Sequence, residues 1–130
     1  MNSLPTSPPV AAADASWQTG AMGTLAEIAI HAWRLQRRMR DKTTRQVLDD
    51  QRASHRHVEG ILESLAAAGF SLRDREGEPY DYGLPERVVA AEKRPGLPRE
   101  VVLETIRPSL FFQGQILRPG EIIIAVPAES

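Results

Sequence analysis

The 130-residue chain contains no cysteine, and aromatic residues make up only 5% of it. Without cysteine there can be no disulfide, cysteine-ligated zinc, iron–sulfur cluster or thiol nucleophile, which favours a reducing compartment. No apolar run approaches the roughly 20 residues that a membrane-spanning helix needs. The net charge of -1 shows no excess of either sign that would draw the chain to a membrane or to nucleic acid. We therefore expect a cytoplasmic protein with neither kind of partner.

Glycine and proline are absent between residues 24 and 59, where apolar residues recur at helical intervals. Thr24 and Glu27 have the spacing of a capping box, in which each side chain satisfies the other residue's free backbone N–H. This pair predicts the start of a helix. Upstream, residues 1–23 are rich in proline, alanine, serine and threonine and include Trp17. We expect this segment to be a disordered N-terminal tail.

A second pair with capping-box spacing, Thr43 and Gln46, predicts another helix from about Arg45 after a tight break. A continuous helix through this stretch fits the sequence as well. Gly69 predicts the end of the second helix, because glycine readily adopts the left-handed conformation that closes a helix. Residues 24–69 would then form a helical hairpin.

Apolar residues form a stripe along each predicted helix. Two helices alone leave one side of each stripe in water, whereas two copies of the hairpin would bury both stripes in a four-helix bundle. The sequence therefore predicts a homodimer. The residues expected at its interface are Leu25, Ile28, Ala32, Leu35, Met39, Val58, Ile61 and Leu65.

After Gly69, frequent glycine and proline divide the chain into short segments. Strand-like runs lie at residues 101–106, 110–112 and 122–126. We expect a linker over residues 70–78, a small all-β wing over residues 79–127 and a C-terminal tail over residues 128–130. The predicted fold class is α+β, with a two-helix hairpin that pairs into a dimeric four-helix bundle and is followed by the β wing.

Three stretches in the C-terminal half occur in a characteristic order: Gly77-Glu78-Pro79-Tyr80-Asp81, Pro98-Arg99-Glu100-Val101-Val102, and Gly114 to Ile124 with the sequence GQILRPGEIII. They resemble the end of the GrpE family of nucleotide exchange factors, which carries an aromatic–Asp element, a spacer, and a glycine ahead of a Leu-Arg strand. Here the Leu-Arg pair is Leu117-Arg118. Since the family also has two helices per chain in a dimeric bundle, the resemblance covers about residues 25–126.

The chain departs from the family pattern at three places in the wing. The family's Gly-aromatic pair falls at Ser109-Leu110, its usual His at Pro85, and its following Ala at Arg87. Upstream, the family's long coiled-coil helix falls on the segment expected to be a tail. The resemblance is thus to a short, divergent member of the family.

The resemblance implies a co-chaperone and not an enzyme, with no catalytic residue, cofactor or metal. In the family, the wing presses on the nucleotide-binding domain of an Hsp70-type ATPase and favours its open cleft, so that ADP leaves. The wing residues expected to contact the partner are Arg107, Leu110, Phe111, Phe112, Gln115, Arg118 and Pro119. The replaced pair at Ser109-Leu110 leaves open an adaptor that binds an Hsp70-like or actin-like partner without exchange activity.

The basic run from Arg34 to Arg45 raises nucleic-acid binding as a further alternative. We interpret the run instead as a solvated helix face whose last cations lie near the negative end of the helix dipole. The negative net charge and the lack of aromatic residues in the run other than Trp33 favour this interpretation.

Polar side chains of the second predicted helix suggest no metal or catalytic site. His55 and His57 project about 200° apart on a helix and cannot share one ion. His55 with Glu59 could, but structural histidines are commoner. The carboxylates of this stretch have the pattern of a solvated helix face, with no nucleophile or phosphate-binding glycine loop beside them.

Overall fold

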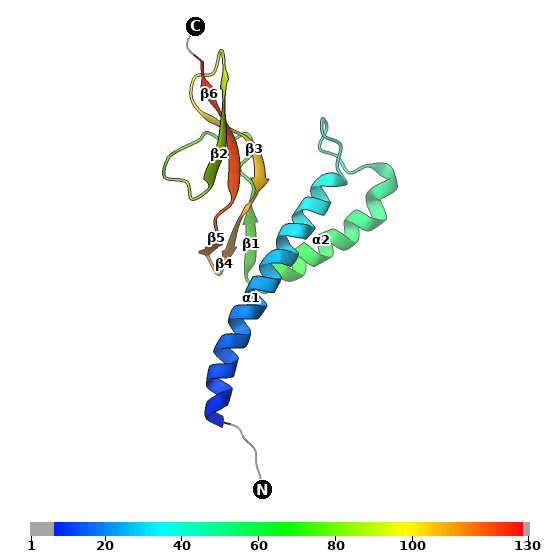
Figure 1. Cartoon of the computed structure of the whole chain (residues 1–130). Coiled ribbons are helices and arrows are strands. Elements are labelled where there is room, and N and C mark those ends of the chain that lie inside the picture. The colour runs from blue at the N-terminus through cyan, green and yellow to red at the C-terminus, as the bar shows by residue number, and fades with distance from the viewer. Residues whose placement is uncertain (1–6, 129–130) are drawn as a thin grey trace. The chain divides into compact units, whose positions relative to one another are not determined.

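The computed structural model describes residues 7–128, with side chains from residue 20 onward, and Figure 1 shows the order of its elements. The chain divides into an N-terminal unit, residues 1–58, and a C-terminal unit, residues 59–130. Helix α2 crosses the boundary between them. No helix within the described part of the chain is long and apolar enough to span a membrane. Of the expected tail over residues 128–130, only Ala128 is described.

Helix α1, Ser7–Arg38, begins well upstream of the expected start at Thr24. Pro8 and Pro9 lie in its first turn, where a missing N–H costs nothing and the fixed φ of proline suits a helix. The alanines that follow have the highest helix propensity of any residue. Residues 7–23, expected to be part of a disordered tail, are therefore helical, and residues 1–6 lie outside the described part of the chain.

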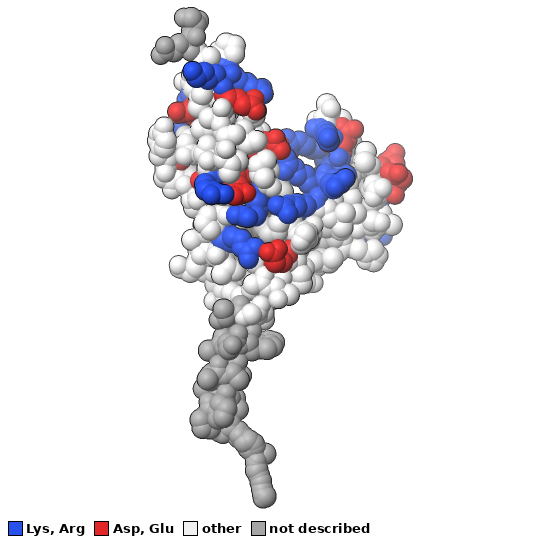
Figure 2. Space-filling view, in the orientation of Figure 1, with Lys and Arg blue, Asp and Glu red and all other residues white. Residues whose placement is uncertain are grey.

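A hydrogen-bonded hairpin loop over residues 39–48 follows α1. At its base, the backbone N–H of Leu48 donates to the carbonyl of Met39 at 2.9 Å. Arg40 and Val47 form an antiparallel β-bridge one step further out. Figure 2 shows Lys and Arg side chains gathered over this loop and the adjoining end of α1. The loop is an ordered two-stranded turn and not the tight break expected there.

Asp41 organises the tip of this loop. Its Oδ1 accepts hydrogen bonds from the backbone N–H groups of Thr43 at 2.8 Å and Thr44 at 2.9 Å. These hydrogen bonds lower the pKa of Asp41 below its ordinary value of 3.8, because they favour the ionised carboxylate. The bond from Thr44 has the larger effect and the bond from Thr43 the smaller. Arg45 takes a left-handed φ of 65° and donates its N–H to the Asp41 carbonyl at 2.8 Å, which turns the chain back.

Helix α2, Arg52–Ala67, begins later than the expected position near Arg45 and is preceded by a 3-10 turn, η1, Asp49–Gln51. Thr43 does not cap it, because Thr43 lies in the loop, nine residues before α2 begins. The expected end of the helix is confirmed, since Gly69 has a left-handed φ of 102° just beyond Ala67.

The structure has the expected α+β content, but the helical hairpin and the dimeric four-helix bundle built from it are wrong. The two helices follow one another along the chain with 32 and 16 residues, and the strands fill the C-terminal half. Helices of such unequal length cannot run side by side along two full stripes. The capping-box spacing misled the prediction, because the same side chains also stabilise turns.

The described part of the C-terminal unit contains six strands in two three-stranded sheets. They are β1 Phe70–Arg73, β2 Arg87–Arg94, β3 Val101–Arg107, β4 Ser109–Phe112, β5 Gln115–Arg118 and β6 Glu121–Pro127. One sheet has the antiparallel order β1-β4-β5, and the other has the order β2-β6-β3 with β2 parallel to β6. The expected strand runs coincide with β3, β4 and β6, whereas β1 lies in the expected linker.

Strand β6 is the centre of the second sheet and carries its core. Ile122 and Ile124 pack with Val102 of β3 and with Tyr80, which is buried ahead of β2. A central strand is covered by neighbours on both edges, which suits its continuous apolar run. This core fixes the position of the segment before β2, in which Tyr80 lies.

Gly120 lies where the two sheets meet, at the turn between β5 and β6. A Cβ at this position would stand 2.3 Å from the carbonyl oxygen of Arg107 and 2.6 Å from the backbone nitrogen of Ser109. No side chain fits at such distances. The glycine of the Leu-Arg-Pro-Gly stretch is therefore required by the close approach of two backbone segments.

Candidate partner-binding site

Five of the seven residues expected to contact a partner lie on the β4–β5 hairpin, while Arg107 ends β3 and Pro119 follows β5. The register pairs Phe112 with Gln115 and Leu110 with Arg118. The strands are joined by Gln113 and Gly114, which both have positive φ, as in the type I′ turns that match the twist of a hairpin. The structure thus brings these side chains, together with Phe111, into one small antiparallel sheet with β1.

Burial separates these residues into two groups. Leu110 is fully buried, so it cannot touch a partner directly, while Gln115 and Pro119 are exposed. Phe111 and Phe112 are half-buried. The ring of Phe112 packs on Phe70 of β1 with centroids 4.9 Å apart, which holds the hairpin to its neighbouring strand.

Arg107 is held within the unit instead of projecting into solvent. Its Nη2 donates to the carbonyl of Pro119 at 3.1 Å and lies 4.0 Å from the carboxylate of Glu121. Glu121 is also paired with Arg87 of β2. The buried Nε of Arg107 has no hydrogen-bond partner within the described residues. Arg107 therefore ties the end of β3 to the turn before β6.

Besides Val89 of β2, three large apolar side chains beyond Gly69 are exposed but were absent from the expected contact set. Ile116 and Leu117 of β5 are 43% and 40% exposed, and Tyr82 is 84% exposed. The sequence held a signal for the first two, since adjacent residues of a strand point to opposite faces and β5 is an edge strand. Nothing in the sequence distinguished Tyr82 from Tyr80, although one is exposed and the other buried.

Tyr82 is held by an ordered turn. The Asp81 carboxylate accepts the backbone N–H of Gly83 at 2.9 Å, and the Leu84 N–H donates to the Asp81 carbonyl at 3.0 Å. The Tyr82 ring meets the Tyr80 ring edge-on at 5.5 Å. An exposed aromatic ring that is already ordered loses little entropy on binding, which is typical of an interface anchor.

Burial raises the pKa of the Tyr80 phenol above its ordinary value of 10.0. The neighbouring phenol of Tyr82 and the carboxylates of Glu100, Asp81 and Glu86 act in the same direction, because they disfavour a further negative charge. Tyr80 is therefore a neutral core residue at physiological pH.

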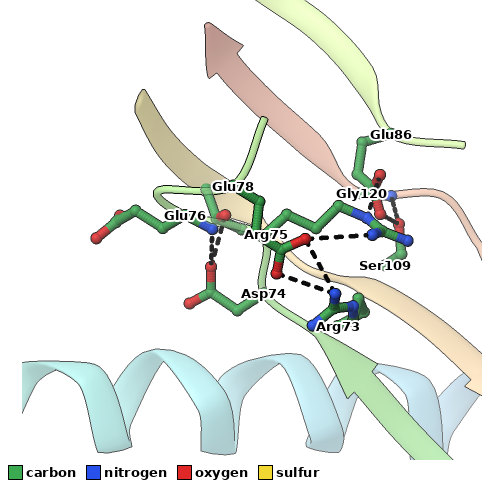
Figure 3. A network of polar contacts seen from close by, with 9 residues as sticks. Arg73, Asp74, Arg75, Glu76, Glu78, Glu86, Ser109 and Gly120 are labelled. Atoms are coloured by element: carbon green, nitrogen blue, oxygen red, sulfur yellow. Dashed lines mark hydrogen bonds and ion pairs between the residues drawn. The ribbon is translucent and has the colours of Figure 1, made fainter. Parts of the chain in front are cut away.

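A buried polar network joins the segment before β2 to the start of β4 (Figure 3). Glu86 accepts a hydrogen bond from Arg75 at 2.8 Å and another from the Ser109 hydroxyl at 2.5 Å. The Ser109 oxygen in turn accepts the backbone N–H of Gly120 at 2.8 Å. Glu86 has a side chain only 1% exposed, so its charge depends on these donors.

The network gives Ser109 a specific role. A glycine at this position, as in the resembled family, offers no hydroxyl for Glu86 or for the Gly120 N–H. Here the hydroxyl satisfies both groups. The base of the β4–β5 hairpin is therefore fixed relative to Glu86, which lies four residues after Tyr82. The hydrogen bonds among Glu86, Ser109 and Gly120 thus connect the segment that carries Tyr82 to the hairpin that carries Ile116 and Leu117.

The residues expected at the dimer interface do not form one continuous exposed stripe. Ala32, Met39, Val58 and Leu65 are buried within the chain, and Leu25 is half-buried. Ile28, Leu35 and Ile61 remain exposed. Ile28 and Leu35 are the exposed pair on α1. They are seven residues apart and therefore lie on one side of the helix.

His55, considered as a metal ligand, is a buried structural residue. Its Nε2 accepts a hydrogen bond from Nε of Arg40 at 3.4 Å, which links α2 to the loop after α1. Among the residues that the structure describes, no three His, Asp or Glu side chains are grouped so that they could hold a metal ion.

No protein-family model matches this chain, and no curated protein is similar enough to count as a match. The resemblance to GrpE proteins therefore rests on the residues named in the sequence analysis.

Proposed function

We propose that the protein is a GrpE-like co-chaperone that binds the nucleotide-binding domain of an Hsp70-type ATPase and promotes ADP release. The mechanism is linkage without covalent chemistry. A protein that binds the open state of the ATPase more tightly than the closed state weakens ADP binding by the same factor. A hundredfold effect needs only about 2.7 kcal/mol of differential contact, which a few well-packed side chains can supply.

The observation that carries the proposal is the stretch from Gly114 to Ile124. Its order of glycine, Leu-Arg pair, small residues and β-branched strand is the most specific part of the family resemblance. Gly120 supplies a physical reason for part of that pattern, since a Cβ at this position would stand within 3 Å of the backbone between β3 and β4. A pattern required by packing supports a shared fold of this segment.

We infer that the contact surface includes Tyr82 and the edge strand β5, whose exposed Ile116 and Leu117 point to opposite faces of the sheet. All three side chains are exposed. The Glu86–Ser109 network orders the segments that carry them before any partner binds. Arg118 and Gln115 would supply polar contacts beside this apolar centre, as at the rim of many interfaces.

The test is stopped-flow release of a labelled ADP from the Hsp70-type ATPase of the same cell. We expect the full chain to accelerate release, and we expect Tyr82→Ala to reduce the acceleration about tenfold, as for an interface anchor. Val89→Ala is the control, because Val89 is a 45% exposed apolar residue of β2 outside the inferred surface. An unchanged release rate at saturating protein would contradict exchange activity.

The adaptor remains a second candidate, and Ser109 is the observation that favours it. The bonded Ser109 side chain makes the hairpin base more rigid than a glycine would. A more rigid surface suits steady binding of one partner state and not the opening of a cleft. For an adaptor, the ATPase would be recovered in a pull-down by the full chain while ADP release stayed slow.

Two further expectations from the sequence belong to this proposal. We propose a cytoplasmic location, in keeping with the absence of cysteine. We also propose self-association, now through the exposed side of α1 that carries Ile28 and Leu35 and not through paired hairpins.

A further inference from the structure

The loop after α1 collects an unusual concentration of positive charge. Between residues 34 and 56 the chain holds eight basic and three acidic side chains. Residues 59–130, by contrast, hold eight basic and twelve acidic ones. The near-neutral net charge of the whole chain therefore conceals a basic region in one unit and an acidic excess in the other.

The loop presents these cations in a defined arrangement. Its β-bridge and its Asp41-bound tip fix the backbone that carries Lys42 and Arg45. Arg37 and Arg38 lie in the last turn of α1, immediately before the loop. Arg40 is half-buried, and the other basic side chains of the region are exposed; these are Arg34, Arg37, Arg38, Lys42, Arg45, Arg52 and Arg56.

The three carboxylates of this region offset only part of this charge. Asp41 is engaged by backbone N–H groups of the loop, and Asp49 lies 2.8 Å from Arg52 in an exposed ion pair. Such an exposed pair contributes little stability and is readily exchanged. Eight basic against three acidic side chains leave an excess of five positive charges over these residues.

We propose that this basic loop region binds the phosphate backbone of double-stranded nucleic acid without sequence preference. Seven of the eight cations are arginines, whose planar guanidinium groups suit bidentate contact with phosphate. The remaining exposed side chains of the loop include Thr43, Thr44 and Gln46, which are typical donors to phosphate oxygens. This reverses the expectation that was based on the net charge of the whole chain.

The surroundings of the cations favour nucleic acid over an acidic protein or a membrane. Leu35 and Leu48, which are 46% and 39% exposed, lie near the two ends of the loop, but no apolar side chain between them is exposed, since Met39 is buried and Val47 half-buried. A protein interface needs an apolar centre, and a membrane-binding segment needs apolar side chains to insert. Residues 34–56 contain no Phe, Tyr or Trp, and Trp33 just before them is buried, which leaves no platform for unpaired bases within the region and favours a duplex.

The test is fluorescence anisotropy of a labelled DNA duplex of arbitrary sequence titrated with the full chain at several salt concentrations. We expect binding at low salt that weakens steeply as salt rises. The double variant R38E/K42E should bind about tenfold more weakly, with the salt slope reduced by about one unit for each phosphate group that the variant no longer neutralises. Both side chains are exposed, and an unchanged far-UV circular dichroism spectrum would show that the variant is folded.

The matched control is K93E/R94E, which makes the same change of charge at exposed positions of β2 in the C-terminal unit. We expect its affinity for the duplex to be unchanged. An equal loss in the control, or no binding of the duplex at low salt, would overturn the proposal. So would equal binding of a polyglutamate peptide or of phosphatidylserine vesicles, which would assign the loop to an acidic protein or to a membrane.

Discussion

Two single residues of the C-terminal unit, Gly120 and Ser109, are required by contacts that the fold makes around them. Gly120 is needed because two backbone segments approach within van der Waals distance, and Ser109 because its hydroxyl satisfies a buried carboxylate and a buried N–H. Neither residue is exposed, yet both determine where the half-buried rings of β4 and the exposed residues of β5 lie.

Gly120→Ala should lower the free energy of unfolding by about 3 kcal/mol, because the added methyl group meets the Arg107 carbonyl at 2.3 Å. Urea denaturation followed by circular dichroism measures this loss. Gly60→Ala is the control, since Gly60 lies within α2 with nothing near its Cβ position. There alanine should raise stability by roughly 0.5–1 kcal/mol. A stability of Gly120→Ala equal to that of the natural chain would contradict the close approach.

Tyr80 should make stability sensitive to alkaline pH. Because its pKa is raised in the folded state, the folded protein holds the phenol proton more tightly than the unfolded chain does. The contribution of Tyr80 is therefore complete below pH 10.0 and is lost as pH rises through the higher folded value. Urea midpoints measured from pH 8 upward should fall less in Tyr80→Phe than in the natural chain. An identical fall in both would show that Tyr80 is not responsible.

At the scale of elements, the loop over residues 39–48 is the clearest difference between expectation and structure. The pair Thr43 and Gln46 fits a helix cap, but the Asp41 carboxylate binds the N–H of Thr43 first and closes a turn. Local side-chain hydrogen bonds of this kind compete with helix formation. The delayed start of α2 and the projection of the basic loop both follow from that competition.

Asp41→Ala should loosen the loop tip without unfolding the helices. In the natural chain, the lowered pKa of Asp41 means that its contribution is present above pH 3.8 and is lost as pH falls through the lower folded value. The loosening of the loop tip is measured by amide hydrogen exchange at Thr43 and Thr44. Exchange at both amides should be faster in Asp41→Ala than in the natural chain at neutral pH. Asp50→Ala, an exposed carboxylate just beyond the loop, should leave both amides protected. Equal protection in the two variants would contradict the role of Asp41.

At the scale of the whole molecule, the two units differ in net charge and in the binding function proposed for each. The C-terminal unit carries exposed apolar side chains beside an acidic excess, whereas the loop region of the N-terminal unit is basic and polar. The first composition suits a protein partner and the second a phosphate backbone. The two proposals can therefore fail independently, since they use different residues and different assays.

Self-association is the prediction that belongs to the whole molecule. Ile28 and Leu35 are 44% and 46% exposed on one side of α1. We expect a dimer at micromolar concentration in sedimentation velocity and a monomer for Leu35→Glu, because a buried unpaired charge opposes association. Val89→Glu, the same change at an exposed residue of β2, should remain dimeric. A monomeric natural chain at these concentrations would rule out self-association through α1.

The sequence by itself determined helical structure over residues 24–38 and 52–67, the end of α2 at Gly69, and the strands that coincide with β3, β4 and β6, because these depend on local pattern and backbone propensity. It did not distinguish buried Tyr80 from exposed Tyr82, or reveal the parallel pairing of β2 with β6. Nor did it show that Ser109 joins a buried carboxylate to the Gly120 backbone. Those features depend on contacts between residues far apart in the chain, so only the tertiary structure decided them.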